Sequence, residues 1–383
     1  MNSTTNTPEK LPHSSISLYQ AFGQVPDPRG KRGLRYPLAV ILTVVTLAKL
    51  CGETELRGIA QWAQYRAASL CAAFELKREA MPHWTTYSRV LSQVEEVVLQ
   101  QALQSRRDEA EIQDAQLIID GKTLRGTIPV GKTQGEHLLS VYAPDSRVVL
   151  SQTTVEDKEN EIVVAPHLLE QTALKGKVIT GDAMFTQRQL SQQIRDAEGD
   201  YIWVVKENQP HLYQMIDRLF TPERRRPGHG RLQTDFQTIR QVSKGHGRCE
   251  CRTLTTSRLL EDYGEWPEMR QVFRLERQRH LKGRPATTEV VYGVTSLEAQ
   301  IGSPAALLRF VRRHWAIENQ LHYVRDVSLR EDRCRLISSS AQIVMAILNN
   351  LVIALLPQTP FRYLPDAQRF YNAHLASALH LLL

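Results

Sequence analysis

The 383-residue sequence contains few long apolar runs. Its most apolar segment, Pro37–Leu47, has about half of the roughly 20 residues that a membrane span needs, and Lys49 follows it closely. The first ten residues are polar and lack the apolar centre of a secretion signal. These absences predict a protein that is neither secreted nor inserted in a membrane, with Pro37–Leu47 inside a core helix.

Cysteine is also scarce, with five residues in an odd and irregularly spaced set. A disulfide framework is therefore not expected, and a reducing, cytoplasmic compartment fits the composition better. The spacing His246-x2-Cys249-x-Cys251 resembles half of a zinc site, but no second pair of ligands follows at a suitable distance. We interpret the thiols as buried or strand-facing side chains, with a zinc-stabilised module as the alternative.

Positively charged residues outnumber negatively charged ones only slightly. Lys and Arg number 48 against 41 Asp and Glu, which gives a net charge of +7, and 42% of the residues are hydrophobic. This composition is typical of a globular protein of two or three domains and not of a disordered chain. The modest excess of positive charge favours a polyanionic partner without identifying it.

The pattern of predicted elements changes along the chain and defines six segments. A polar, mobile N-terminus precedes a helical domain, which is either a plain bundle or a DNA-binding unit. Strands then alternate with helices, an inserted β-rich region follows, helices resume, and a tail ends the chain. The predicted boundaries are, in the same order, 1–14, 15–108, 112–220, 221–295, 303–360 and 361–383.

The middle of the chain predicts a mixed α/β domain. Its elements come in the order strand, hairpin, helix, strand, helix, strand, which is the order of a ribonuclease-H-like mixed sheet flanked by helices. Other mixed sheets are compatible with it. The predicted strands and helices are Gln116–Asp120, His137–Tyr142 with Arg147–Thr154, Asn160–Leu174, Lys177–Thr180, Gln187–Ala197 and Tyr201–Val205.

Three carboxylates stand at positions where packing has little use for a charge. Asp120 and Asp182 follow two predicted buried strands, and Glu318 lies on a predicted helix, Pro304–Val327, beside its apolar stripe. Three carboxylates on a rigid frame suit a hard divalent cation such as Mg²⁺ or Mn²⁺, and a pair of such ions aligns phosphodiester chemistry. The alternative for each acid is a solvated strand end or helix face.

Four spaced motifs give the pattern a family resemblance. They are Ile119-Asp120-Gly121-Lys122-Thr123-Leu124-Arg125-Gly126, Gly181-Asp182-Ala183-Met184-Phe185-Thr186-Gln187, Lys244-Gly245-His246-Gly247-Arg248-x-Glu250-x-Arg252 and His314-Trp315-x-Ile317-Glu318-Asn319. Together with Asp27-Pro28-Arg29 and the helical region after it, they resemble the DDE transposases of bacterial insertion sequences, specifically the H-repeat-associated (ISAs-type) branch. The resemblance spans nearly the whole chain.

The resemblance implies a catalytic, metal-binding triad of Asp120, Asp182 and Glu318 in a ribonuclease-H-like core, with two Mg²⁺ or Mn²⁺ ions. It also implies cut-and-paste DNA transposition and a homo-oligomer on double-stranded DNA, both element ends and target, in the bacterial nucleoid. The wider group carries a Tyr-x2-Arg-x3-Glu-x6-Lys signature around the Glu. Here His314 stands at the Arg position and Arg325 at the Lys position, while Val311 replaces the Tyr.

Several polar residues are expected to contact the DNA backbone, because they follow predicted strand ends or share the helix of Glu318. They are Lys122, Arg125, Lys206, Gln209, His314 and Arg325. A solvated polar helix face is the alternative for His314 and Arg325. We interpret Trp315 as a core aromatic residue, with stacking on a DNA base as the alternative. At the level of function, the alternatives are a Mg²⁺-dependent nuclease that only cuts and a domesticated, non-transposing DNA-binding relative.

Overall fold

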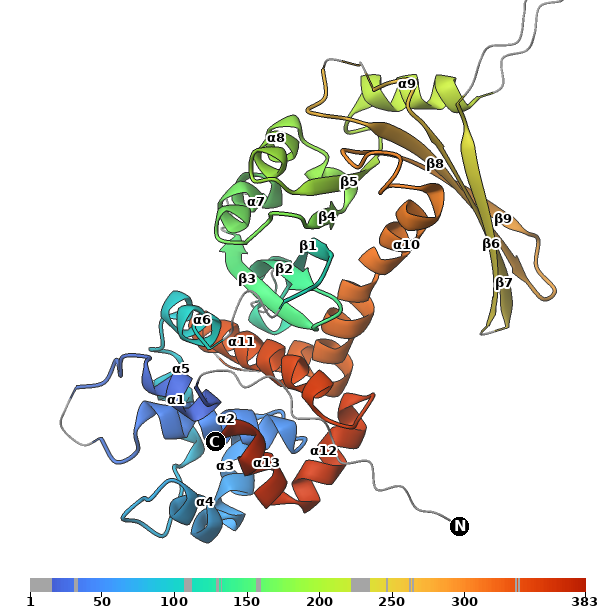
Figure 1. Ribbon diagram of the computed structural model, residues 1–383. Helices are drawn as coiled ribbons and strands as arrows, with labels where there is room; N and C mark the ends of the chain where they lie inside the picture. The colour runs from blue at the N-terminus through green and yellow to red at the C-terminus, as the bar shows by residue number, and fades with distance from the viewer. Residues whose placement is uncertain are drawn as a thin grey trace, which may run out of the picture.

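The structure is a computed structural model (Figure 1). It describes residues 16–30, 34–106, 112–128, 131, 133–155, 160–221, 235–245, 247–261, 263, 265–334, 336 and 338–383. The N-terminus predicted over 1–14 and the zinc candidate His246 lie outside the described residues.

The N-terminal part is a helical domain organised around one buried helix. Its helices are α1 (Leu18–Gly23), α2 (Leu38–Leu50), α3 (Leu56–Tyr65), α4 (Ala67–Ala73), α5 (Trp84–Leu91) and α6 (Glu96–Gln104). Every residue of α2 is buried, so the prediction of a core helix here is confirmed. Helices α3 and α4 are separated only by Arg66, whose backbone leaves the helical conformation.

The following residues build the first five strands of a mixed sheet. They are β1 (Gln116–Thr123), β2 (His137–Ala143), β3 (Val148–Val155), β4 (Val178–Gly181) and β5 (Asp200–Val205). Strands β1, β2 and β3 pair antiparallel, whereas β4 pairs parallel with β1 and with β5, in the spatial order β3-β2-β1-β4-β5. This is the ribonuclease-H-like arrangement that the order of elements predicted.

The β-rich region continues this sheet. Its strands are β6 (Gln237–Gly245), β7 (Arg248–Ser257), β8 (Gln271–Leu281) and β9 (Thr287–Thr295). They pair antiparallel, and β9 joins the core by pairing antiparallel with β5, so the nine strands form one sheet in the order β3-β2-β1-β4-β5-β9-β8-β7-β6. The insertion therefore extends the sheet of the α/β domain beyond β5, and Figure 1 shows its strands curving away from the core.

Helices cover both faces of the sheet, and the alternation of side chains along β1 decides which residue faces which helices. The helices α7 (Glu161–Glu170), α8 (Arg188–Asp196) and α9 (Pro210–Phe220) pack on the face of Leu117 and Ile119. On the other face, Ile118 packs with the helical domain and with α11 (Ser339–Leu355). Next to it on that face, Val178 packs with α10 (Pro304–His314).

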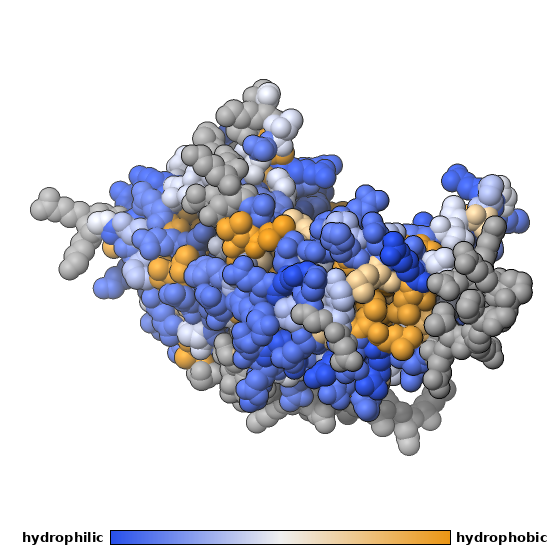
Figure 2. All heavy atoms as spheres, turned by 90° about the horizontal axis from the view of Figure 1, so that it is seen from above, coloured by the Kyte–Doolittle hydropathy of each residue, from blue (hydrophilic) through white to orange (hydrophobic). Residues whose placement is uncertain are grey.

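A second strongly apolar helix, near the C-terminus, is also a core element. Residues Ser339–Gln358 are long and apolar enough to cross a membrane, but 89% of that window is buried inside the protein, as in the core helix of a globular protein. The short helices α12 (Leu364–Ala373) and α13 (Leu375–Leu382) return to pack against α2, so the C-terminus lies beside the N-terminal helices (Figure 1). The face in Figure 2 is largely hydrophilic, with hydrophobic residues in small separate patches.

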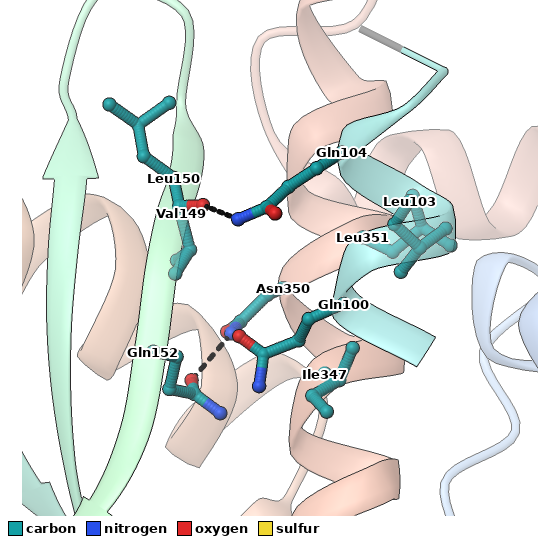
Figure 3. Close-up of a pocket in the computed structure, with 9 residues that line it drawn as sticks. All are labelled: Gln100, Leu103, Gln104, Val149, Leu150, Gln152, Ile347, Asn350 and Leu351. Atoms are coloured by element: carbon teal, nitrogen blue, oxygen red, sulfur yellow. Dashed lines mark hydrogen bonds between the residues drawn. The ribbon is translucent and has the colours of Figure 1, made fainter. Parts of the chain in front are cut away.

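A small cavity lies where α6, β3 and α11 meet (Figure 3). Gln104 donates to the carbonyl oxygen of Leu150 at 2.7 Å, and Asn350 donates to Gln152 Oε1 at 2.8 Å. Its volume of about 30 Å³ is that of one water molecule. The cavity is therefore a polar seam between the helical domain and the sheet, and it is too small for a substrate.

Candidate active site

The parallel register of two central strands brings Asp120 and Asp182 level with each other. Gln116 pairs with Val178 and Ile119 with Gly181, an offset of 62 residues (178 − 116) that also separates Asp120 from Asp182 (182 − 120). Asp120 was predicted at a strand end, whereas β1 continues to Thr123 along β2. Only its pairing with β4 stops at Ile119, so the two carboxylates flank the point where β1 and β4 separate.

The side-chain alternation also turns both aspartates to the same face of the sheet. Asp120 shares its face with Ile118, and Asp182 follows Val178 at an even spacing. Ile118 packs in the cluster that contains Ile317, and Val178 packs against α10. The two carboxylates therefore face the helix that carries Glu318.

That helix is not the uniform α-helix expected over Pro304–Val327. After α10 it widens into two π-helical segments, η4 (Ile317–His322) and η5 (Val324–Ser328). A π-turn bonds residue i to i+5, so side chains beyond it leave the positions that a 3.6-residue period assigns to them, and such turns are frequent at functional sites. A regular α-helical period would place His322 and Arg325 on the polar side of the helix with Glu318, whereas both are buried in the structure.

Two histidines of this helix contact the three acids: His322 contacts two of them and His314 contacts the third. His322 Nδ1 lies 3.3 Å from Glu318 Oε2 and 3.6 Å from Asp120 Oδ2. His314 Nε2 lies 3.5 Å from Asp182 Oδ1, and its Nδ1 lies 3.3 Å from Thr180 Oγ1. The structure thus brings Asp120, Asp182 and Glu318 to one place at the end of β4.

The protonation states of these groups are set by burial and by each other. Burial, followed by the charge of Asp182, raises the pKa of Asp120 to about 7. A hydrogen bond from His314 lowers the pKa of Asp182, against the effect of its partial burial. Burial, with the charges of Arg325 and Lys122, lowers the pKa of His322 to about 3. At neutral pH, Asp182 is ionised, His322 is neutral, and Asp120 lies near its midpoint.

This donor set fits a hard divalent cation once the side chains rotate. As they stand, the described residues contain no group of three or more His, Cys, Asp or Glu side chains that could hold one metal ion. The side chains of Asp182 and Glu318 are 70% and 57% exposed and so have room to turn. A cation beside Asp120 would offset the burial and the Asp182 charge that raise its pKa, and carboxylate oxygens are the ligands that Mg²⁺ prefers.

The residues expected to contact DNA from the first and later strands occupy different environments. Lys122 is nearly buried, and its Nζ lies 2.6 Å from Asp326 Oδ2. Arg125 is 76% exposed, with Nε 3.8 Å from Asp332 Oδ2. Lys206 is exposed, and its charge contributes to the lowered pKa of Asp182.

Gln209 is half-buried and has a local partner. Its Nε2 donates to the carbonyl oxygen of Thr186 at 2.8 Å, which ties the start of α9 to the loop after Asp182. Gln209 therefore holds this loop by a bond inside the protein.

Arg325 does not reach the surface, and the expected DNA contact is not compatible with its position. Its side chain is 0% exposed, and its NH2 atom lies 2.7 Å from Glu331 Oε1. Glu331 also accepts from Asn349 Nδ2 at 2.8 Å, and Lys49 Nζ donates to Asn349 Oδ1 at 2.7 Å. Arg325 belongs to a buried polar network that ties the π-helix to α11 and to α2.

Two residues of the helix differ from the sequence interpretation. His322 has no role in the sequence interpretation, although its position four residues after Glu318 is a signal that the two side chains meet. Trp315 was interpreted as a core aromatic, but it is 58% exposed. It caps α10 beside His314, where its apolar ring remains in solvent.

Comparison with known proteins places the chain in a family. Residues 19–105 match the family model described as DDE_Tnp_1-associated, and residues 112–355 match the Transposase DDE domain. The chain is 28% identical over 349 residues to "Putative transposase YncI" of Escherichia coli O157:H7, covering 89% of this chain and 87% of that protein. It is 27% identical over 351 residues to "H repeat-associated putative transposase YhhI" of Escherichia coli (strain K12), with coverages of 88% and 90%.

Among solved structures, "Cryo-EM structure of piggyBac transposase synaptic complex with hairpin DNA" aligns with a TM-score of 0.46 and 10% identity, over 96% of this chain and 82% of that chain. The family models carry the assignment, because the second of them alone matches more than half of the chain. The chain belongs to the bacterial DDE transposases, in the H-repeat-associated branch that its four motifs predicted.

Proposed function

We propose that Asp120, Asp182 and Glu318 are the catalytic carboxylates with which this transposase cleaves insertion-sequence ends and joins them to target DNA. The observation that carries the proposal is their meeting point: two aspartates level on parallel strands, and a glutamate that contacts Asp120 through His322. The carboxylates are partly exposed, and the pKa of Asp120 is raised. Both properties are typical of acidic side chains that bind a cation. Mg²⁺ or Mn²⁺, two ions per site, is the cofactor that this set favours.

The proposed reaction has two phosphoryl transfers. In the first, water attacks a phosphodiester at the element end; a bond from its oxygen to phosphorus forms, the bond to the 3′ oxygen breaks, and that oxygen takes up a proton. In the second, the freed 3′-hydroxyl loses its proton and its oxygen bonds to the phosphorus of a target phosphodiester; the bond from that phosphorus to the target's own 3′ oxygen breaks, and the departing oxygen takes up a proton. The cations, when bound, supply Lewis acidity to both steps.

The side chains of this chain orient the reaction. Asp120, Asp182 and Glu318 are the residues that would hold the cations. The neutral His322 positions Asp120 and Glu318, whereas His314 keeps Asp182 ionised. Lys206, exposed beside Asp182, is placed to attract a phosphate, and Arg125 extends the positive surface further along.

The partner is double-stranded DNA, both element end and target, in the bacterial cytoplasm. Two ends must be held together for insertion, so we infer that the protein acts as a homo-oligomer on DNA. The excess of 48 Lys and Arg over 41 Asp and Glu supports a polyanionic partner.

The test uses the full chain with linear DNA that carries the element's ends and a supercoiled target plasmid. We expect Mg²⁺-dependent release of 3′-hydroxyl ends and joined products, and loss of both in Asp182→Ala with an unchanged circular dichroism spectrum. Cleavage that persists in this variant overturns the catalytic assignment. Cleavage without joined products favours a nuclease that only cuts, and wild-type binding without cleavage favours a domesticated DNA-binding relative.

A further inference from the structure

The motif from Lys244 to Arg252 has no part in the catalytic site, yet it builds a distinct surface on the extended sheet. Alternate residues of β7 point to the side of α10, and Glu250 is buried at their centre. Arg248 Nε lies 3.0 Å and Arg279 Nε 3.4 Å from Glu250 Oε1, and Arg252 pairs with the other carboxylate oxygen. One buried carboxylate thus organises three guanidinium groups.

Two further arginines complete this surface. Arg277 of β8 lies directly opposite Arg252 in the ladder, and Arg312 of α10 donates to Gln241, the other ladder partner of Arg252. Burial lowers the pKa of Arg252, and the charges of Arg312 and Arg277 add to that effect. We call the residues Arg248, Arg252, Arg277, Arg279 and Arg312 the arginine cluster.

The arginine cluster holds more positive charge than its own ion pairs neutralise. Its acidic partners are Glu250 and Glu289, the latter paired with Arg277. Like charges directly opposite in a ladder destabilise a sheet, so the pair Arg252 and Arg277 costs stability in the protein alone. An anion that binds across the cluster would offset this repulsion.

A groove beside the arginine cluster is large enough for such an anion and runs toward the segment of Glu318. It has a volume of about 600 Å³ and lies between β6 and α10, with Arg309, Arg312 and Arg313 along one wall. Arg313 pairs with Asp145, while no described ion pair neutralises Arg309 or Arg312. The groove ends at the exposed Trp315 and at Asn319, which flank the segment of the catalytic Glu318.

We propose that the arginine cluster and this groove bind the sugar–phosphate backbone of a DNA duplex and lead it toward the catalytic carboxylates, an inference that rests on the proposed function. Positive charge spread over β7, β8 and α10 matches a polyanion with a phosphate about every 3.4 Å of each strand, whereas a single phosphate would leave most of the guanidiniums unpaired. The β-rich extension is then a DNA-binding arm, with Glu250 as the positioning residue of its arginines.

The test measures binding of the full chain to a random-sequence duplex without divalent metal, by fluorescence anisotropy at several KCl concentrations. In Arg248→Gln/Arg279→Gln we expect a loss of at least about tenfold in affinity, and a salt slope lower by roughly one for each arginine removed. The matched control is Arg188→Gln on α8, an exposed and ion-paired arginine on the opposite face of the sheet. It should bind like the wild type.

A second variant changes the affinity in the other direction. Glu289 is exposed, and Glu289→Gln frees Arg277, so DNA affinity should rise severalfold; a purely structural ion pair predicts no change. Wild-type affinity and salt slope in both cluster variants overturn the inference and leave the proposed function standing. Failure of the wild type to bind DNA at all defeats the proposed function itself.

Discussion

The helical segment after α10 contributes to two clusters of charged side chains, which differ in solvent exposure and in how far their charges are paired. The proposed catalytic cluster, called the catalytic cluster below, consists of Asp120, Asp182 and Glu318. His322 contacts Asp120 and Glu318 and His314 contacts Asp182, at 3.3 to 3.6 Å, and two of the three carboxylates are more than half exposed. The buried cluster pairs Arg325 with Glu331 at 2.7 Å, with both side chains almost fully buried. The same helical segment thus contributes to one cluster whose charges are incompletely neutralised and to another whose charges are paired and buried.

The difference distinguishes the charges that we propose for catalysis from the charges that stabilise the fold. Burial would raise the pKa of Glu331, but the charge and hydrogen bonds of Arg325 outweigh it and lower that pKa. For Asp120, burial and a neighbouring carboxylate act in the same direction and raise the pKa to about 7. A carboxylate whose charge is unsatisfied in the protein alone is the one that a cation can use.

A Glu→Gln substitution should reduce activity in the catalytic cluster and stability in the buried cluster, and the effect on activity should be the larger one. In Glu318→Gln we expect cleavage to fall by about 10³-fold, because several kcal/mol of transition-state stabilisation depends on a correctly held cation. The thermal midpoint should stay within a few degrees of the wild type, since this side chain is 57% exposed. Retained cleavage rates in this variant would falsify a catalytic role for Glu318.

Glu331→Gln should instead unfold the protein more easily. Removing one partner of a buried ion pair leaves the charge of Arg325 uncompensated, which costs about 3 to 5 kcal/mol. Chemical denaturation measures this loss, with Asp366→Asn as the control, because its pair with Arg369 is at the surface and contributes about 0 to 1 kcal/mol. An equal effect of the two substitutions would contradict the distinction between the clusters.

The pH dependence of metal stabilisation tests the catalytic cluster next. The pKa of Asp120 is raised from 3.8 to about 7 in the folded protein, so its contribution to stability is present at low pH and is lost as pH rises through about 7. Mg²⁺ binds the ionised form. The rise in thermal midpoint with Mg²⁺ should therefore be larger at about pH 8 than at about pH 6 in the wild type.

The control for this pH effect is Asp120→Asn, which removes the titrating carboxyl group. Its response to Mg²⁺ should be weak and should change little between the two pH values. Equal Mg²⁺ shifts at both pH values in the wild type would show that Asp120 does not govern metal binding.

The smallest effect concerns His322, which contacts two of the acids without being a carboxylate itself. In His322→Gln we expect the Mg²⁺ concentration for half-maximal cleavage to rise by about tenfold, with kcat at saturating Mg²⁺ nearly unchanged. His167→Gln on α7 is the matched control, because that histidine is 70% exposed and its acidic partner is Glu170, which is not one of the three acids. A lower thermal midpoint without a change in Mg²⁺ requirement would make His322 merely structural.

Much of the fold was predictable because local patterns agree with it. The buried run of α2, the hairpin β2–β3 and the order of β4, α8 and β5 follow from periodicity and turn residues, with boundaries within a few residues. The continuity of the sheet through β9 was not predictable. It depends on a pairing between β5 and β9, about 90 residues apart, that leaves no local pattern.

The candidate acids were predicted from strand ends, helical spacing and the family motifs, whereas the DNA contact of Arg325 was misjudged. An α-helical period places Arg325 beside Glu318 on a polar face, but the π-turns shift it into the interior. A π-turn is stabilised by its tertiary surroundings and not by any residue preference that the sequence displays.

The sequence by itself determined which residues carry charge, which segments are apolar enough to form a core, and the family to which the chain belongs. Only the tertiary structure decided which charges meet: the 62-residue register that levels Asp120 with Asp182, the π-turns that bury Arg325, and the ladder that gathers arginines around Glu250. The physical reason is that charge and hydrophobicity belong to each residue, whereas the environment that turns a charge into a ligand or a structural tie belongs to the packing.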